Sequence, residues 1–125
     1  MTKKVLVLSA SFRKHGNSDM LCDRFIQGAR EAGNEVEKIY VSDMRIGYCR
    51  GCGVCNREQQ CVQNDDMAAV LDKMVAADVI VMATPVYFYS MNGQLKTLID
   101  RTVPRYEEIR GKDFYYIVAA ADRTR

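Results

Sequence analysis

Four cysteines crowd into one short stretch of the chain and could bind a metal or a redox cluster. They are Cys49, Cys52, Cys55 and Cys61, spaced C-x2-C-x2-C-x5-C. A four-iron, four-sulfur cluster takes four thiolates, and such closely spaced cysteines can supply them. Zinc is an alternative, although structural zinc sites usually pair C-x2–4-C units across a longer gap. A third interpretation leaves the thiols uncoordinated on a loop.

A second stretch, Ser9 to Ser18, has the composition of a phosphate-binding loop. It reads Ser-Ala-Ser-Phe-Arg-Lys-His-Gly-Asn-Ser, between an apolar run and a helical pattern. Backbone N–H groups at a helix N-terminus point outward unpaired, and the helix dipole favours an anion there. Hydroxyls add donors, and Arg13 offers a charge-assisted hydrogen bond. The alternative is an ordinary strand-to-helix loop capped by Ser18.

A third stretch, Pro85 to Ser90, is aromatic and follows another apolar run. Together with a phosphate loop at a neighbouring strand end, it indicates a planar, phosphorylated ligand. FMN fits better than a dinucleotide, because no G-x-G-x-x-G follows the first apolar run and no acidic residue is placed to hold an adenosine ribose. The aromatic side chains could lie along the isoalloxazine ring, or they could instead cover the helix that follows.

The hydrophobic pattern predicts the elements that must position these stretches. Strands are expected at 3–9, 36–42, 79–83 and 114–121, and helices at 18–33, 65–76 and 91–101. The expected helix caps are Ser18, Asn64 or Asp65, and Ser90. Thr84-Pro85 is expected to end the third strand. The stretch from 43 to 64, which carries the clustered cysteines, is expected to be an irregular loop.

This alternation predicts an α/β fold of the flavodoxin-like, doubly wound type, with a parallel sheet in a three-layer α/β/α arrangement. Ligands bind such sheets beyond the carboxyl ends of the strands, where both loops and the segment after Ala121 would meet. We expect a single domain over 1–125, with the cysteine loop 43–64 as an insertion. The flavodoxin-like order needs a fifth strand and usually a last helix. The chain is therefore expected to be C-terminally incomplete, or to have its edge covered by another subunit.

Composition excludes several classes of partner. The chain has 125 residues and a formal net charge of +2, with no basic run, which argues against nucleic-acid binding. No signal-peptide core follows Met1 and no apolar run is long enough to span a membrane, so we expect a soluble cytoplasmic protein with no membrane partner. Without an export signal, crowded cysteines favour metal or redox chemistry over a disulfide scaffold. Cys22 stands apart and is expected to be a buried, inert thiol.

The loop motifs resemble those of the NAD(P)H-dependent FMN reductases of the flavodoxin-like superfamily, most closely the iron–sulfur flavoproteins. The first family motif, roughly G-S-P-R-x-x-G-N-[ST], is similar to Ala10–Ser18. The second, S-P-V-Y-x5-G-Q-x-K, is similar to Thr84–Lys96, and the cysteine segment and the Asp100-Arg101 pair also agree. Ala10 and Phe12 replace the usual glycine and proline, so the loop backbone could differ in detail.

This resemblance implies a noncovalent FMN, NAD(P)H as co-substrate and assembly as a homodimer or homotetramer. The residues expected to contact FMN are Ser9, Ser11, Phe12, Arg13, Gly16, Asn17, Ser18, Pro85, Val86, Tyr87, Phe88 and Tyr89. No side chain stands out as a catalytic acid or base, because the chemistry of such proteins resides in the flavin. The sole histidine, His15, is expected in solvent.

The implied function is an FMN-dependent oxidoreductase. Electrons would come from reduced nicotinamide, or from a reduced iron–sulfur protein such as ferredoxin. They would pass through FMN to a small acceptor, or to a cluster held by the four cysteines. The alternatives are a non-enzymatic electron carrier with flavin and cluster, and a redox-sensing module in which the cysteines form disulfides.

Overall fold

Four parallel strands form the centre of the protein in a computed structural model that describes residues 2–121. They are β1 (Lys4–Ser9), β2 (Glu35–Tyr40), β3 (Val79–Tyr87) and β5 (Asp113–Ala119), in the order β2-β1-β3-β5. A two-residue strand, β4 (Ser90–Met91), pairs antiparallel with the end of β3. This order matches the first four strands of the flavodoxin-like order 2-1-3-4-5, which confirms the predicted fold class.

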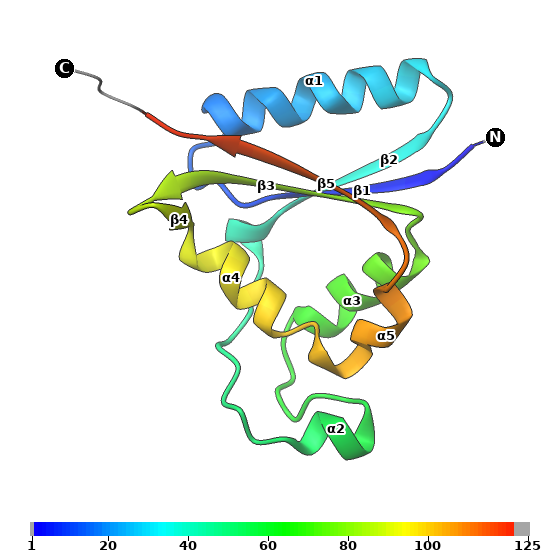
Figure 1. Ribbon diagram of the computed structural model, residues 1–125, viewed down its shortest axis with the longest axis vertical. Coiled ribbons are helices and arrows are strands. Elements are labelled where there is room, and N and C mark those ends of the chain that lie inside the picture. Colours follow the sequence, from blue (N-terminus) through cyan, green and yellow to red (C-terminus); the bar gives the residue numbers. More distant parts are fainter. Residues whose placement is uncertain (1, 122–125) are drawn as a thin grey trace.

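Helices cover both faces of the sheet (Figure 1). Helix α1 (Asn17–Glu31) lies on one face, and α3 (Met67–Ala76), α4 (Gly93–Asp100) and α5 (Tyr106–Ile109) lie on the other. Successive strand residues point to opposite faces. Leu6 and Leu8 of β1 therefore join the core beneath α3 and α4, whereas Val5 and Val7 join the core beneath α1. Among the described residues, none of the helices combines the length and the apolar character needed to cross a membrane.

Strand β5 has an open outer edge within the part of the chain that the structure describes. No strand of residues 2–121 pairs with this edge, and Tyr115, Tyr116 and Val118 are exposed. This agrees with the expected hydrophobic edge. The segment expected to approach the ligand after Ala121 lies outside the described residues.

The starts of α1 and α4 differ from the predicted ones. Helix α1 follows Gly16, not Ser18, which lies buried in the first turn. Helix α4 follows Asn92, not Ser90; the Asn92 side chain accepts a hydrogen bond from the backbone N–H of Leu95 at 3.0 Å. Both observed caps have extended backbone torsions, which a capping residue requires. Several residues in each loop are of types that cap helices, glycine included, and the path of the backbone selects among them.

The end of β3 also differs from the prediction. The strand continues through Pro85 to Tyr87. Thr84 and Pro85 belong to it because they pair with Val118 and Ala119 of β5, whereas Val86 and Tyr87 also pair with β4 after the chain turns back. Pairing with β1 ends at Ala83 and pairing with β4 begins at Val86, so Pro85 lies at an unpaired edge, where proline is tolerated. Residues 86–91 therefore form a β-hairpin and not an irregular loop.

The cysteine loop contains more structure than predicted. It includes the short helix α2 (Val54–Glu58), and a 3-10 turn, η1 (Val41–Asp43), leads into it. A second 3-10 turn, η2 (Val103–Arg105), follows α4 and packs against α2. Helix α3 begins at Met67, after Asp66 and not after Asn64 or Asp65. The other predicted element ends lie within two residues of the observed ones.

Candidate functional site

The stretch Ser9–Ser18 is predicted to bind phosphate, and we call it the phosphate loop. It lies near the aromatic hairpin at the carboxyl edge of the sheet. Ser9, the last residue of β1, pairs with Ala83 of β3. The next residue, Ala10, donates its backbone N–H to the Ala83 carbonyl at 2.9 Å. The loop 10–16 therefore leaves the sheet beside β3, which continues from Ala83 to Tyr87 and into the hairpin turn. We call these two segments together the carboxyl edge.

The phosphate loop is a tight turn before α1. The Ser11 hydroxyl accepts the backbone N–H of Arg13 at 3.0 Å, and Gly16 donates its N–H to the Arg13 carbonyl at 2.9 Å. A Cβ atom at Gly16 would lie 2.9 Å from that carbonyl oxygen, so the turn needs glycine. No side chain caps α1 at Gly16. The first N–H groups of the helix therefore remain available to an anion, beside the exposed Arg13 and Asn17.

The fully buried carboxylate of Asp19 supports this loop from the interior. Its oxygens accept hydrogen bonds from the Ser9 hydroxyl at 3.0 Å and from the His15 backbone N–H at 2.8 Å. The Lys38 ammonium lies 2.6 Å away. Burial acts to raise the pKa of Asp19, but these partners outweigh it and lower the pKa. Sequence reasoning places Ser9 beside the phosphate; in the structure its hydroxyl faces Asp19 instead.

Lys38, on β2, completes this network. Its ammonium also lies 2.8 Å from Asp23 and 4.4 Å from the centre of the Tyr40 ring. Burial acts to lower the pKa of Lys38, but hydrogen bonds to Asp19 and Asp23 outweigh it and raise the pKa. The buried pair therefore stays ionised near neutral pH. No local sequence signal reveals this pair, because its members lie on different elements.

Two aromatic side chains project from the hairpin turn between β3 and β4. Phe88 and Tyr89 have φ values of 47° and 69°, as a two-residue type I′ turn requires, although bulky residues rarely adopt them. Each residue is 93% exposed, and their rings meet edge to face with centroids 5.5 Å apart. They do not cover α4. They offer an apolar surface to a planar ligand, flanked by the exposed Tyr87.

Asn92 joins the two halves of the carboxyl edge. Its fully buried side chain donates to the Ala10 carbonyl at 2.6 Å and accepts the Leu95 N–H at 3.0 Å. Its backbone N–H donates to the Thr84 hydroxyl at 3.0 Å. One residue thus ties together the start of the phosphate loop, β3 and the start of α4, through its side chain and its backbone N–H. Our sequence reasoning did not identify Asn92, although asparagine directly before a helical pattern is a cap signal.

All four clustered cysteines line one cavity of about 210 Å3. Cys49 and Cys52 are exposed, Cys55 and Cys61 are half-buried, and all are free thiols. Gly51 and Gly53 have φ values of 66° and 77°, so the turns between successive cysteines need glycine. The far wall of the cavity comes from the segment after α4 and includes Arg101 and Pro104. The remaining cysteine, Cys22, is buried, and burial raises the pKa of its thiol, as expected for an inert core residue.

The two ends of the cysteine loop are fastened together by carboxylates. Asp66 accepts the backbone N–H of Arg45 at 2.6 Å, and Asp65 accepts that of Gly47 at 2.8 Å. Arg101 forms a two-point ion pair with Asp65 at 2.8 and 3.0 Å. Hydrogen bonds from Arg101 are the main cause that lowers the pKa of Asp65 to about 2. The ends of the loop are thus fixed, while its middle carries the thiols.

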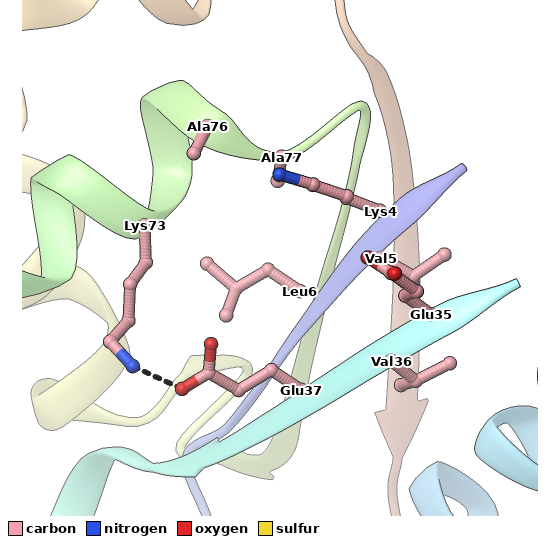
Figure 2. Close-up of a pocket in the computed structure, with 9 residues that line it drawn as sticks. All are labelled: Lys4, Val5, Leu6, Glu35, Val36, Glu37, Lys73, Ala76 and Ala77. Carbon is pink, nitrogen blue, oxygen red and sulfur yellow. Dashed lines mark hydrogen bonds and ion pairs between the residues drawn. The ribbon is translucent and has the colours of Figure 1, made fainter. Parts of the chain in front are cut away.

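A separate pocket of about 310 Å3 lies between β1, β2 and α3 (Figure 2). It includes Lys4 and Glu35, the first residues of their strands, and the ion pair between Lys73 and Glu37. The amino ends of the strands are opposite the carboxyl edge. This pocket therefore does not belong to the candidate site.

Comparison with protein families gives one match over nearly the whole chain. A family model described as NADPH-dependent FMN reductase matches residues 3–124. An iron-sulfur flavoprotein of Archaeoglobus fulgidus is 38% identical over 101 residues, which cover 81% of this chain and 46% of that protein. An iron-sulfur flavoprotein of Methanosarcina thermophila is 37% identical over 100 residues, covering 80% and 52%. The chain spans about half the length of these curated relatives.

Solved structures share the fold. An NAD(P)H:quinone oxidoreductase from Methanothermobacter marburgensis superimposes with a TM-score of 0.77 at 19% sequence identity. The match covers 98% of this chain and 69% of that one. At this level of identity the likeness concerns the fold alone, and it agrees with the strand order and helix layers described above.

Proposed function

The chain belongs to the NADPH-dependent FMN reductase family, and from that premise we propose that it is an oxidoreductase that binds FMN at the carboxyl edge. Its electrons would come from NADH or NADPH and would pass to a small acceptor or to a cluster at the cysteines. The observation that carries this proposal is the bridge through Asn92, which binds Ala10, at the start of the phosphate loop, and Thr84 of β3, the strand that leads into the exposed aromatic turn.

The groups at the carboxyl edge fit FMN in charge and in shape. The uncapped first turn of α1, with Arg13 and Asn17 beside it, suits a dianionic monophosphate. We assign Ser11, Phe12, Gly16 and Ser18 to the same subsite and give Ser9 a supporting role through Asp19. The exposed rings of Phe88 and Tyr89 suit a flat isoalloxazine, with Pro85, Val86 and Tyr87 along the same strand end.

Bound FMN would supply hydride and electron transfer at its N5 position. The residues of this chain would bind and orient it. Asp19 and Lys38 would keep the phosphate loop in shape, and the hairpin turn would provide a surface for the ring. We assign no catalytic acid or base.

We further propose that the four cysteines hold a four-iron cluster. Among residues 2–121, one group of three or more candidate ligands has its ligand atoms within 4.8 Å of one another, namely His15, Asp19 and Asp23. Lys38 already neutralises those carboxylates, so they are a poor metal site. The close C-x2-C-x2-C-x5-C spacing lacks the longer gap usual between the cysteine pairs of structural zinc sites. This spacing supports a cluster over zinc.

The test is an absorption spectrum of the full-length protein purified without oxygen. We expect flavin bands together with a broad iron–sulfur shoulder, and we expect NADH or NADPH to bleach the flavin bands. A protein that neither contains nor takes up FMN would contradict the central proposal. Flavin bands without the shoulder would remove the cluster, and the cysteines would then be better explained as a disulfide-forming redox sensor.

Flavin bands that neither nicotinamide bleaches would favour a non-enzymatic electron carrier. In that case a reduced iron–sulfur protein such as ferredoxin would be the donor to test next. A homodimer or homotetramer remains our proposal for the assembly, supported by the exposed aromatic side chains of β5. Sedimentation at several protein concentrations measures it.

A further inference from the structure

Arg101 is a buried cation in the wall of the cysteine cavity. Its side chain is 2% exposed. One terminal nitrogen, Nη1, donates to the Gly47 carbonyl and to Asp65, both at 2.8 Å, and Nη2 donates to the other Asp65 oxygen at 3.0 Å. This two-point geometry fixes the plane of the guanidinium. Arg101 therefore has one orientation, set by both ends of the cysteine loop.

The third nitrogen of the guanidinium has no partner. Nε of Arg101 is buried and makes no hydrogen bond to any atom of the described residues. Buried N–H donors are almost always paired, because an unpaired donor loses its hydrogen bond to water without replacement. An orphaned donor on a cation, at the wall of a cavity lined by four thiols, indicates that something in the cavity accepts its hydrogen.

Cys61 is the cysteine best placed to be involved. Its sulfur already accepts the backbone N–H of Gln63 at 3.4 Å. The pKa of Arg101 is raised, chiefly by its hydrogen bonds to Asp65, and the nearby Cys61 sulfur contributes in the same direction. The loop backbone therefore already provides one donor to the Cys61 sulfur, and Arg101 lines the same cavity with its Nε–H unpaired.

We propose that Arg101 is a positioning residue of the cysteine site and sets its charge. Its Nε–H donates a hydrogen bond to the Cys61 thiolate, or to an inorganic sulfide beside it, when the cysteines hold a cluster. The inference rests on the proposed function, in which these cysteines bind a four-iron cluster. The reduction potential of a cluster depends on net charge and on hydrogen bonds to its sulfurs. Arg101 favours the reduced cluster, which carries one more negative charge, whereas the carboxylate of Asp65 opposes it.

Arg101 also connects the two candidate sites. Helix α4 begins after Asn92, at the carboxyl edge, and ends directly before Arg101. Its eight residues span about 12 Å, at 1.5 Å per residue. A rigid helix therefore fixes the guanidinium at one end and the aromatic hairpin at the other, and it holds the cysteine cavity at a set distance from the flavin.

The test measures the midpoint potential of the cluster in single-charge variants. Full-length protein is reconstituted without oxygen using ferrous iron and sulfide. Iron content, the absorption shoulder and the midpoint potential are then recorded. We expect Arg101→Gln to shift the potential to more negative values, because a cation is lost and Asp65 is left unpaired. Asp65→Asn should shift it to more positive values, because the cation remains. Arg101→Lys should lie between wild type and Arg101→Gln.

Opposite shifts distinguish this role from a structural one, since mere loosening of the loop would change both variants in the same direction. Arg110→Gln is the matched control: it removes an exposed arginine paired with Glu107, and its potential should equal that of wild type. Shifts of the same sign in Arg101→Gln and Asp65→Asn, or no shift in either, would overturn the inference. If Arg101→Gln fails to take up iron, an unchanged or more negative potential in Asp65→Asn overturns it.

The wild-type protein alone tests the proposed cluster, and the variants test the role of Arg101. Wild-type protein that takes up no iron and sulfide has no cluster, so that outcome refutes the cluster, and the inference with it, before any variant is compared. Wild-type protein that holds the cluster leaves the variants to decide the role of Arg101 alone.

Discussion

The phosphate loop is anchored by buried groups along its length, whereas the cysteine loop is anchored at its two ends and carries its thiols near the surface. Asp19 and Asn92, both fully buried, bind the first loop to the sheet and to α4. Asp65, Asp66 and Arg101 close the second loop, but Cys49 and Cys52 are exposed. The carboxyl edge is thus shaped by the fold itself. The ends of the cysteine loop are fixed, and we call these fixed ends its frame. A bound group would bring the four thiols together within this frame.

The largest effect should follow from Asp19→Ala. This change leaves the Lys38 ammonium without its buried partner, which costs about 3–5 kcal/mol of folding free energy. Urea unfolding of the two proteins measures the loss. Asp23→Ala is the matched control, because Asp23 pairs with the same ammonium from a half-exposed position, and it should cost less than about 1 kcal/mol. Equal losses in the two variants would contradict a carboxyl edge anchored from the interior.

Asn92→Ala should come next. It removes a helix cap worth about 1 kcal/mol and leaves the buried Ala10 carbonyl unpaired at a cost of about 1–3 kcal/mol. We therefore expect a total loss of about 2–4 kcal/mol in thermal or urea unfolding. Asn92→Ser keeps a capping oxygen and should recover about 1 kcal/mol of it. FMN affinity should fall in both variants. Unchanged FMN affinity would show that the two loops act independently.

Arg13→Ala distinguishes residues that contact FMN from residues that only stabilise the phosphate loop. Arg13 is exposed, so the free energy of unfolding without FMN should barely change. FMN affinity should fall by about 1.5–3 kcal/mol, the scale of a hydrogen bond to a charged group. Fluorescence titration of the apoprotein with FMN measures this, and riboflavin, which lacks the phosphate, is the control ligand. Equal losses for FMN and riboflavin would mean that the phosphate binds elsewhere.

The smallest effect concerns the frame of the cysteine loop and depends on pH. The pKa of Asp65 is lowered from 3.8 to about 2 in the folded protein. A lowered folded-state pKa contributes stability above pH 3.8 that is lost as the pH falls through about 2, and the shift corresponds to about 2 kcal/mol. Asp65→Asn should lack this component. The difference in unfolding free energy between wild type and variant should therefore shrink between pH 4 and pH 2. A constant difference would mean that the ion pair contributes nothing to the frame.

The parallel sheet was predictable because its signals are local. Val5–Leu8 and Val79–Met82 are continuous apolar runs, which are typical of strands buried on both faces. The carboxyl ends of parallel strands lie at one edge, so placing Ser9–Ser18 beside Pro85–Ser90 needed only the order of elements. The cysteine spacing likewise predicted one shared site, and all four cysteines do line one cavity.

The predicted helix caps and strand end were wrong because neighbouring residues are similarly suited to these positions. Ser18 and Ser90 can cap a helix as well as Gly16 or Asn92 can, and only the path of the backbone selects among them. Likewise, Pro85 signals a strand end in isolation. It lies inside β3 because β5, a strand far away in the sequence, pairs with it through Ala119.

The sequence by itself therefore determined the elements, their order and the edge at which chemistry could occur, because these depend on periodicity and short spacings. The tertiary structure alone decided which groups support that chemistry. Asp19 with Lys38, Asn92 with Ala10, and Arg101 with Asp65 are partners from different elements. Such pairs become strong only when folding buries them, because burial removes the water that would otherwise bind each group.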